Sequence, residues 1–150
     1  MWPIILACGG FLLAVLWMDL MFDVQVLRYR DRADALPEEV VASIAAYYRR
    51  VTTDARPMSH AVGVVMAIAI ISLLIELTQE SVPRWVALAS LLLCGGPVIL
   101  AVRVVRNAVR LGSRTDSLAT QSALARSICR DHLLCLAGIV SFIALQLLAS

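Results

Sequence analysis

Asp19 and Asp23 are the residues of this sequence best suited to acid–base chemistry. They lie four positions apart, so a helix carries both carboxylates on one face. The run from Pro3 to Asp23 is otherwise apolar, interrupted only by Asp19. Charged side chains in such a run usually face the interior of a helix bundle or a water-filled cavity. The pair is therefore predicted to point inward, either as a reactive group or paired with an arginine for structure.

The only two histidines, His60 and His132, each begin an apolar run, and Asp131 precedes the second. Partly buried carboxylates and imidazoles can titrate near neutral pH, which makes all five side chains candidate catalytic acids or bases. A cofactor-free site is the main expectation. Two alternatives stay open: a transition metal held by Asp19, Asp23, His60 and His132, or haem b held between the histidines.

A polar stripe supplies candidate substrate-binding residues. Its members follow i, i+3, i+4, i+7 spacing and share one helix face: Arg103, Arg106, Asn107 and Arg110. The stripe can clamp an anionic or carbonyl oxygen, supply counter-charge to Asp19 and Asp23, or anchor the chain by side chains that reach the membrane interface.

The elements that position these residues are apolar helices. The chain is 61% hydrophobic and 16% charged, whereas an average soluble domain carries about 25% charged residues. Four stretches have the roughly 20 apolar residues that a helix needs to cross a bilayer. They lie at about 3–23, 58–77, 85–105 and 131–149. The sequence thus predicts one all-α domain, an up-down four-helix transmembrane bundle.

The connecting segments are predicted to be helical as well. An amphipathic helix is expected over about 37–53, with proline and two glutamates at its start. Gly112 is expected to cap the third span's helix, and Ser113 to Asp116 to open the next as a capping box. The helices would then extend beyond the membrane.

The arginines predict the orientation. All 13 basic residues are arginine, and both long connections are rich in them, whereas the short turn after the second span holds only Arg84. The positive-inside rule then puts both long connections in the cytosol and both termini outside. A bacterial inner (plasma) membrane is the expected location.

Two further expectations concern partners. Arginines that flank apolar spans do not form the basic face of a nucleic-acid-binding protein, so no nucleic acid is expected. Small residues such as Gly10 and Gly63 allow close helix contacts, either inside the bundle or between copies in a homo-oligomer.

The layout resembles the anthrone-oxygenase-like family of small four-helix membrane proteins. The resemblance rests on the spans, the amphipathic segment Pro37–Val51, the stretch Val105-Arg106-Asn107-Ala108 and the polar entry Arg130-Asp131-His132. It implies a cofactor-independent oxygenase acting on an aromatic or polyketide-like molecule, with Asn107 orienting the substrate and His132 moving a proton.

The leading functional hypothesis is a small membrane enzyme, either an oxygenase-like oxidoreductase or an acid–base catalyst, with a cytosol-facing site. Its substrate would be a small hydrophobic molecule with a polar head. The alternative hypothesis is a non-catalytic membrane subunit, or a carrier of haem or metal.

Overall fold

Four long apolar helices form the body of the protein. The computed structural model describes residues 2–31, 35–55, 57–79 and 83–149. Its elements are α1 (Trp2–Asp23), the 3₁₀ helix η1 (Val24–Tyr29), α2 (Glu38–Arg49), the π-helical turn η2 (Arg50–Asp54), α3 (Pro57–Thr78), α4 (Arg84–Ser113) and α5 (Leu118–Leu148). Helices α1 with η1, α3, α4 and α5 are long and apolar enough to cross a membrane. The predicted all-α four-helix transmembrane bundle is confirmed.

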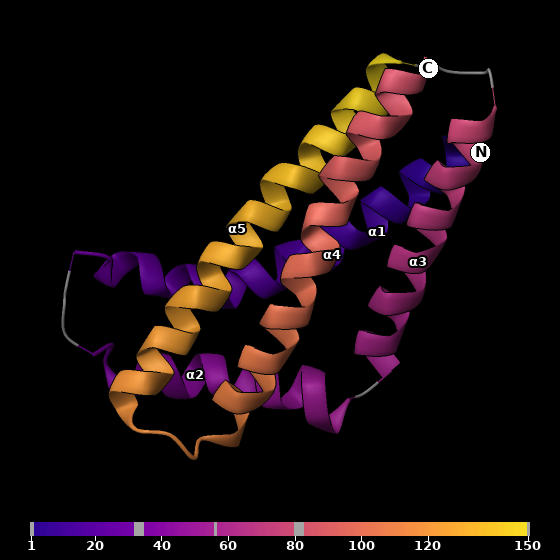
Figure 1. Ribbon diagram of the computed structural model, residues 1–150. Coiled ribbons are helices and arrows are strands. Elements are labelled where there is room, and N and C mark those ends of the chain that lie inside the picture. Colours follow the sequence, from indigo (N-terminus) through magenta and orange to yellow (C-terminus); the bar gives the residue numbers. More distant parts are fainter. Residues whose placement is uncertain (1, 32–34, 56, 80–82, 150) are drawn as a thin grey trace.

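The spans form a ring in which each helix packs on the next. Helix α1 packs on α3, α3 on α4, α4 on α5, and α5 back on α1. Figure 1 shows α4 and α5 side by side, α1 crossing behind them, and α2 lying across one end of the bundle. The first turn of α1 and the last turn of α5 lie together at the opposite end (Figure 1), where the Trp2 indole donates to the Gln146 carbonyl at 3.2 Å. An even number of spans produces this arrangement.

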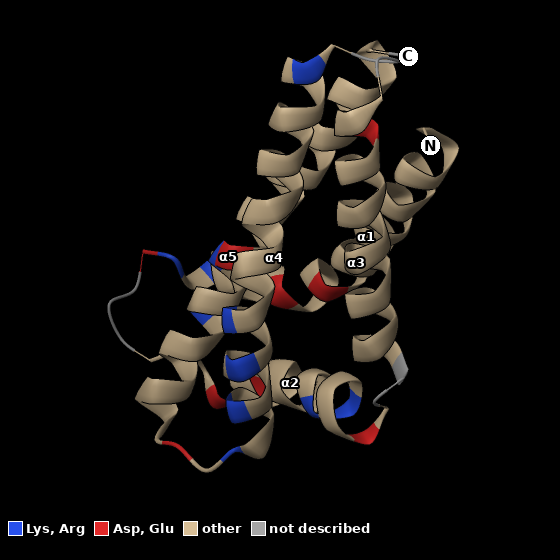
Figure 2. Cartoon of the chain, turned by 45° about the vertical axis from the view of Figure 1, so that its right-hand side comes forward, with Lys and Arg blue, Asp and Glu red and all other residues tan. Residues whose placement is uncertain are grey.

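Charged residues gather at the end of the bundle where α2 lies. Figure 2 shows most of the arginines and acidic residues around α2 and the adjoining halves of α4 and α5. The opposite half is almost entirely uncharged (Figure 2). We call the α2 end the arginine-rich end. Arg32 and Arg56, which also belong to the predicted cytosolic connections, lie outside the described residues.

Helix α2 is amphipathic and buries one face against the arginine-rich ends of α4 and α5. Val41, Ile44 and Tyr48 are almost completely buried, as their three- and four-residue spacing requires. They form one apolar cluster with Leu111 and Ile128. Polar contacts fix the N-terminal end of α2: the Ser122 hydroxyl accepts a hydrogen bond from the Leu36 amide at 2.9 Å, and Arg114 pairs with Glu38.

The turn between α4 and α5 differs from the prediction. Gly112 is not a cap: it lies inside α4, and the left-handed residue that ends the helix is Arg114, with φ of 56°. Helix α5 begins after Ser117, whose hydroxyl accepts from the Thr120 amide at 3.4 Å. Ser113 instead donates to the Arg110 carbonyl at 2.7 Å, within the last turn of α4. The predicted capping box starting at Ser113 is therefore wrong, because Ser113 is still part of the preceding helix.

Gly9 and Gly10 offer a matched test of how closely α1 packs on α5. A Cβ on Gly9 would lie 2.9 Å from the Ile143 Cγ1 and 3.2 Å from Phe142, whereas one on Gly10 would meet nothing within 4 Å. We expect Gly9→Ala to lower the unfolding free energy by about 1 kcal/mol through overpacking. Gly10→Ala should be neutral or slightly stabilising. Unfolding of both variants in detergent tests this, and equal stabilities would contradict it.

Candidate functional site

A buried hydrogen-bond network lies where α1, α2 and α5 meet. Its centre is Asp23, whose side chain is completely buried. The Tyr48 hydroxyl lies 2.8 and 2.9 Å from the two Asp23 carboxylate oxygens. The Nδ1 atom of His132 lies 2.6 Å from Asp23 Oδ2, a short separation for a nitrogen and a carboxylate oxygen. Helix α5 and the amphipathic α2 are thereby joined to the end of α1.

Asp19 lies one turn away on the same face of α1. Tyr47 donates its hydroxyl to Asp19 Oδ1 at 2.6 Å, and the Tyr47 ring stacks on Phe22 with centroids 4.1 Å apart. The His132 Nε2 atom lies 3.9 Å from Asp19 Oδ2. The Asp19 side chain keeps 18% of its surface exposed, unlike Asp23. The two aspartates do face inward, and tyrosines and a histidine are their partners.

The arginine stripe on α4 lies elsewhere. Arg103 forms a two-bond ion pair with Asp131, at 2.7 and 2.5 Å. Arg110 pairs in the same way with Asp116, at 2.7 and 2.8 Å. Arg106 is exposed and Asn107 partly exposed. The stripe therefore binds acidic groups of α5 and of the α4–α5 turn rather than Asp19 and Asp23.

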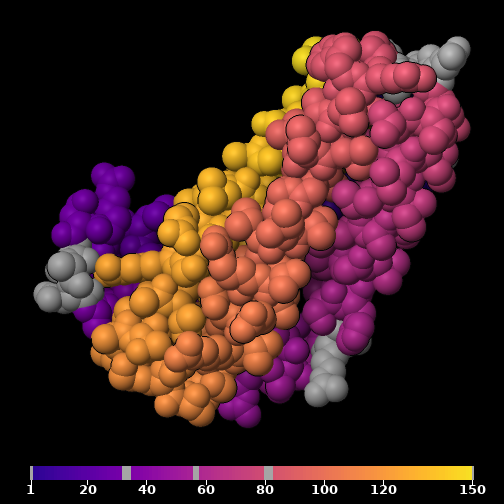
Figure 3. Space-filling model, in the orientation of Figure 1, coloured from indigo at the N-terminus to yellow at the C-terminus, as the bar shows by residue number. Residues whose placement is uncertain are grey.

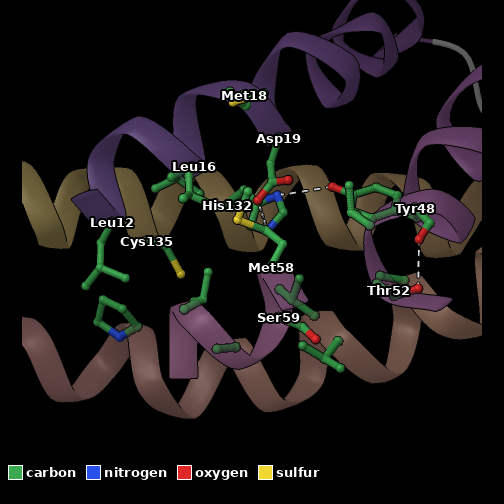
Figure 4. A pocket seen from close by; sticks show the side chains of 18 of the residues that line it. Leu12, Leu16, Met18, Asp19, Tyr48, Thr52, Met58, Ser59, His132 and Cys135 are labelled. Atoms are coloured by element: carbon green, nitrogen blue, oxygen red, sulfur yellow. Dashed lines mark hydrogen bonds and ion pairs between the residues drawn. The ribbon is translucent and has the colours of Figure 1, made fainter. Parts of the chain in front are cut away.

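A cavity of about 220 Å³ opens beside Asp19 and His132. Figure 4 shows Asp19 from α1 and His132 from α5 pointing toward each other at its polar end, with Ser59 and Met58 of α3 nearby. Away from this polar end the wall is apolar and includes Leu12, Leu16, Met66, Pro97 and Ile139. The face that α4 presents to the cavity consists of Pro97, Ala101, Val104, Val105 and Ala108, so all four stripe residues lie outside it.

His60 does not join this group. It is exposed at the start of α3, and Ser59 and Val62 line the cavity in its place. The two histidines are thus not brought face to face. Within the part of the chain that the structure describes, no three His, Cys, Asp or Glu side chains are grouped as metal ligands would be. The four metal candidates are consequently divided between a buried network and an exposed helix start.

Tyr47 and Tyr48 are the site residues that the sequence reading missed. Tyr48 follows Val40 and Ile44 at helical spacing, which predicts only an apolar role, and its ring does pack in the apolar cluster. A buried tyrosine, however, usually finds a hydrogen-bond partner for its hydroxyl. The sequence did carry a signal for these bonds: two adjacent tyrosines lie on the amphipathic helix, and two aspartates lie on the first span.

The two tyrosines predict a distinctive alkaline titration. Burial, followed by the hydrogen bond to Asp19, raises the pKa of Tyr47; burial, followed by the charge of Asp23, raises the pKa of Tyr48. Because the pKa of each tyrosine is raised in the folded state, its contribution to the stability of the fold is complete below the ordinary tyrosine pKa of about 10. That contribution is lost as the pH rises above this value. We expect absorbance near 295 nm to show two of the three tyrosines ionising only on alkaline unfolding. A Tyr47→Phe/Tyr48→Phe variant should lack this delayed component; its persistence would contradict the assignment.

Together, the fold and the site define a small integral membrane protein in which a cavity between the helices adjoins a buried polar network. A family model matches residues 2–148, nearly the whole chain: the SHR3 chaperone family, described as ER membrane protein SH3. The chain belongs to this family. The comparisons with curated proteins and with solved structures gave no match.

The family corrects three predictions. The resemblance to the anthrone-oxygenase-like family is wrong, because it rested on a four-span layout and short polar stretches that unrelated membrane proteins share. The leading hypothesis of an oxidoreductase-like membrane enzyme is wrong as well, and the non-catalytic alternative fits the family better. The bacterial inner membrane is also wrong, since the family is one of ER membrane proteins.

Proposed function

We propose that this protein is a non-catalytic chaperone of the ER membrane that binds transmembrane segments of client membrane proteins. The observation that carries the proposal is the cavity between the spans, with apolar walls and one polar end. Native cores seldom leave voids larger than a water molecule. A pocket of this size inside a small bundle is suited to receive a side chain from a neighbouring helix.

The bonding within the polar network supports a structural role for most of it. Asp23 is completely buried, and Tyr48 and His132 are its partners. Asp131, equally buried, is held by Arg103. The carboxylates of Asp23 and Asp131 are enclosed by these partners and cannot contact a substrate. Asp19 and His132 remain at the cavity wall, where they can recognise a polar group on an otherwise apolar client segment.

The outer surface offers places where a client helix can approach. Space is open around Gly10 on α1 and Gly63 on α3, with nothing within 4 Å of an added Cβ. Large apolar side chains such as Val64 and Ile71 lie exposed along α3. Small residues on a membrane helix let a second backbone come close. The same surfaces can join copies of the chain, and site-directed cross-linking distinguishes a homo-oligomer from a client complex.

The proposal includes an orientation with the arginine-rich end in the cytosol and both termini in the ER lumen. We expect an N-glycosylation tag added to either terminus to be modified in cells, because glycan transfer occurs in the lumen. A tag inserted into the α4–α5 turn should stay unmodified. Glycosidase-sensitive gel shifts measure both, and the reverse pattern would invert the topology.

Filling the cavity tests the proposed function. Ala101 lines the cavity, so Ala101→Phe should occupy it and block client binding. The client is first defined as a polytopic membrane protein whose ER exit fails when this chain is depleted. We expect Ala101→Phe to restore less than about one tenth of that exit, and a photo-cross-linker at Met66 to capture the same client.

The matched control is Val102→Phe, at the next position of α4, where the side chain is 63% exposed. It should support normal ER exit. Thermal unfolding in detergent must show that both variants fold. Full client export with a folded Ala101→Phe variant would refute the cavity as the client site.

A further inference from the structure

A second groove, of about 430 Å³, lies on the outside of the bundle between η1 and α5. Figure 3 shows α5 lying against the violet segment that follows α1. Three arginines and three leucines account for most of its lining: Arg30, Arg126, Arg130, Leu27, Leu133 and Leu134. It lies on the opposite side of α5 from the client cavity, and the two share no lining residue.

The lining residues of α5 are ordered along the helix, from its charged half toward its apolar half. On α5, Arg126 and Arg130 are one turn apart, and Leu133 and Leu134 follow on the next turn, toward the bilayer centre. Eight residues of helix span about 12 Å, the depth from a phospholipid headgroup to the first part of its acyl chains. Leu27 and Leu134 are 43% and 54% exposed. The groove is therefore cationic at headgroup level and apolar beneath it.

Among the described residues, two acids lie near the cationic end, and neither binds its arginine tightly. Asp131 lies 3.4 Å from Arg130, but this buried carboxylate already accepts two hydrogen bonds from Arg103. Asp31 lies 3.7 Å from Arg30, with both side chains largely exposed, at 92% and 77%. Such exposed pairs hold their partners weakly. Arg126 reaches the Tyr29 carbonyl at 3.5 Å, which holds its guanidinium beside the end of η1.

We propose that this groove binds the headgroup of an anionic phospholipid. Guanidinium groups bind phosphate oxygens by paired hydrogen bonds, and the arginines present such groups from two elements. The leucines below supply contact for an acyl chain. A free phosphate ion would use only the upper half of the groove, whereas a phospholipid matches both halves. The proposal is independent of the client cavity.

Lipid binding to the full-length protein in detergent tests the proposal. Native mass spectrometry compares dioleoyl phosphatidic acid with dioleoyl phosphatidylcholine as probes. Arg30→Gln/Arg130→Gln is the test variant, because both side chains are mostly exposed, at 77% and 65%, and should be replaceable without unfolding. Each arginine near an anionic lipid contributes favourable binding free energy. Loss of both arginines should therefore weaken phosphatidic acid binding about thirtyfold.

Arg28→Gln/Arg50→Gln is the matched control. It removes the same charge from exposed positions at the arginine-rich end, outside the groove. We expect it to change binding less than about twofold. Equal losses in the two double variants would overturn the proposal, since only general charge would then matter. Equal binding of phosphatidylcholine, or displacement of phosphatidic acid by millimolar inorganic phosphate, would overturn it as well.

Discussion

Asp23→Ala is expected to cost the protein about 2–4 kcal/mol of unfolding free energy. The substitution removes the carboxylate that Tyr48 and His132 share and leaves both buried polar groups without their partner. Removing one member of a buried ion pair costs about 3–5 kcal/mol in soluble proteins. Hydrogen bonds between membrane helices contribute less, about 0.6–1.7 kcal/mol each. Asp23 has two such partners in a membrane bundle, and the expected loss of unfolding free energy therefore lies between these two cases.

Equilibrium unfolding in mixed detergent measures this cost. The matched control is Asp31→Ala, whose carboxylate is 92% exposed and whose loss should change stability by no more than about 0.5 kcal/mol. A double-mutant cycle between Asp23→Asn and Tyr48→Phe should show coupling, because the two side chains share hydrogen bonds. If Asp23→Ala were no more damaging than Asp31→Ala, the network would not hold α1, α2 and α5 together.

The fold could be predicted from the sequence because membrane spans leave a strong local signal. Each span is a predominantly apolar run of about 20 residues, and Val40, Ile44 and Tyr48 show the amphipathic pattern of α2. The helix caps were harder to place. Ser113 and Ser117 are both suitable N-cap residues. Because α4 continues through Ser113, the residue that caps α5 is Ser117.

The partners within the site could be predicted only in part. Asp19 and Asp23 were expected to point inward because burial of an unpaired charge is costly. Their partners were not predictable, since these depend on how α2 docks across the bundle and on which way each helix is rotated. Rotation turns His60 outward and His132 inward. It also pairs Arg103 with Asp131 on the neighbouring α5 rather than with the aspartates on the diagonal α1.

The predicted enzyme function was wrong because partly buried ionisable groups do not distinguish a catalytic site from a structural network. Both need burial and hydrogen bonds, and both perturb titration. Within the bundle, the close contacts also fall on small residues other than Gly10 and Gly63. Gly10 and Gly63 have open space around them, while Gly9 and Gly112 take the close approaches. Which face of a helix meets its neighbour is a tertiary property that spacing alone leaves open.

Gly112→Ala is expected to loosen α2 from the bundle. An added Cβ would lie 2.9 Å from the Arg49 amide nitrogen and 3.0 Å from its Cα. Backbone atoms cannot rotate aside as a side chain does, so α2 must move. Overpacking of this kind costs about 1–3 kcal/mol. Because Tyr47 and Tyr48 lie directly before Arg49 on α2, the shift should also lengthen their bonds to Asp19 and Asp23.

Gly96→Ala is the matched control, on the same helix and with nothing within 4 Å of an added Cβ. It should stabilise α4 slightly, by up to about 1 kcal/mol, as alanine does in a helix. Unfolding in detergent compares the stabilities of the two variants. Absorbance should also show that the tyrosines of the Gly112→Ala variant ionise at lower pH than those of the control. Equal stability and equal titration would mean that α2 can move without disturbing the network, and α2 would then not determine the geometry at the polar end of the cavity.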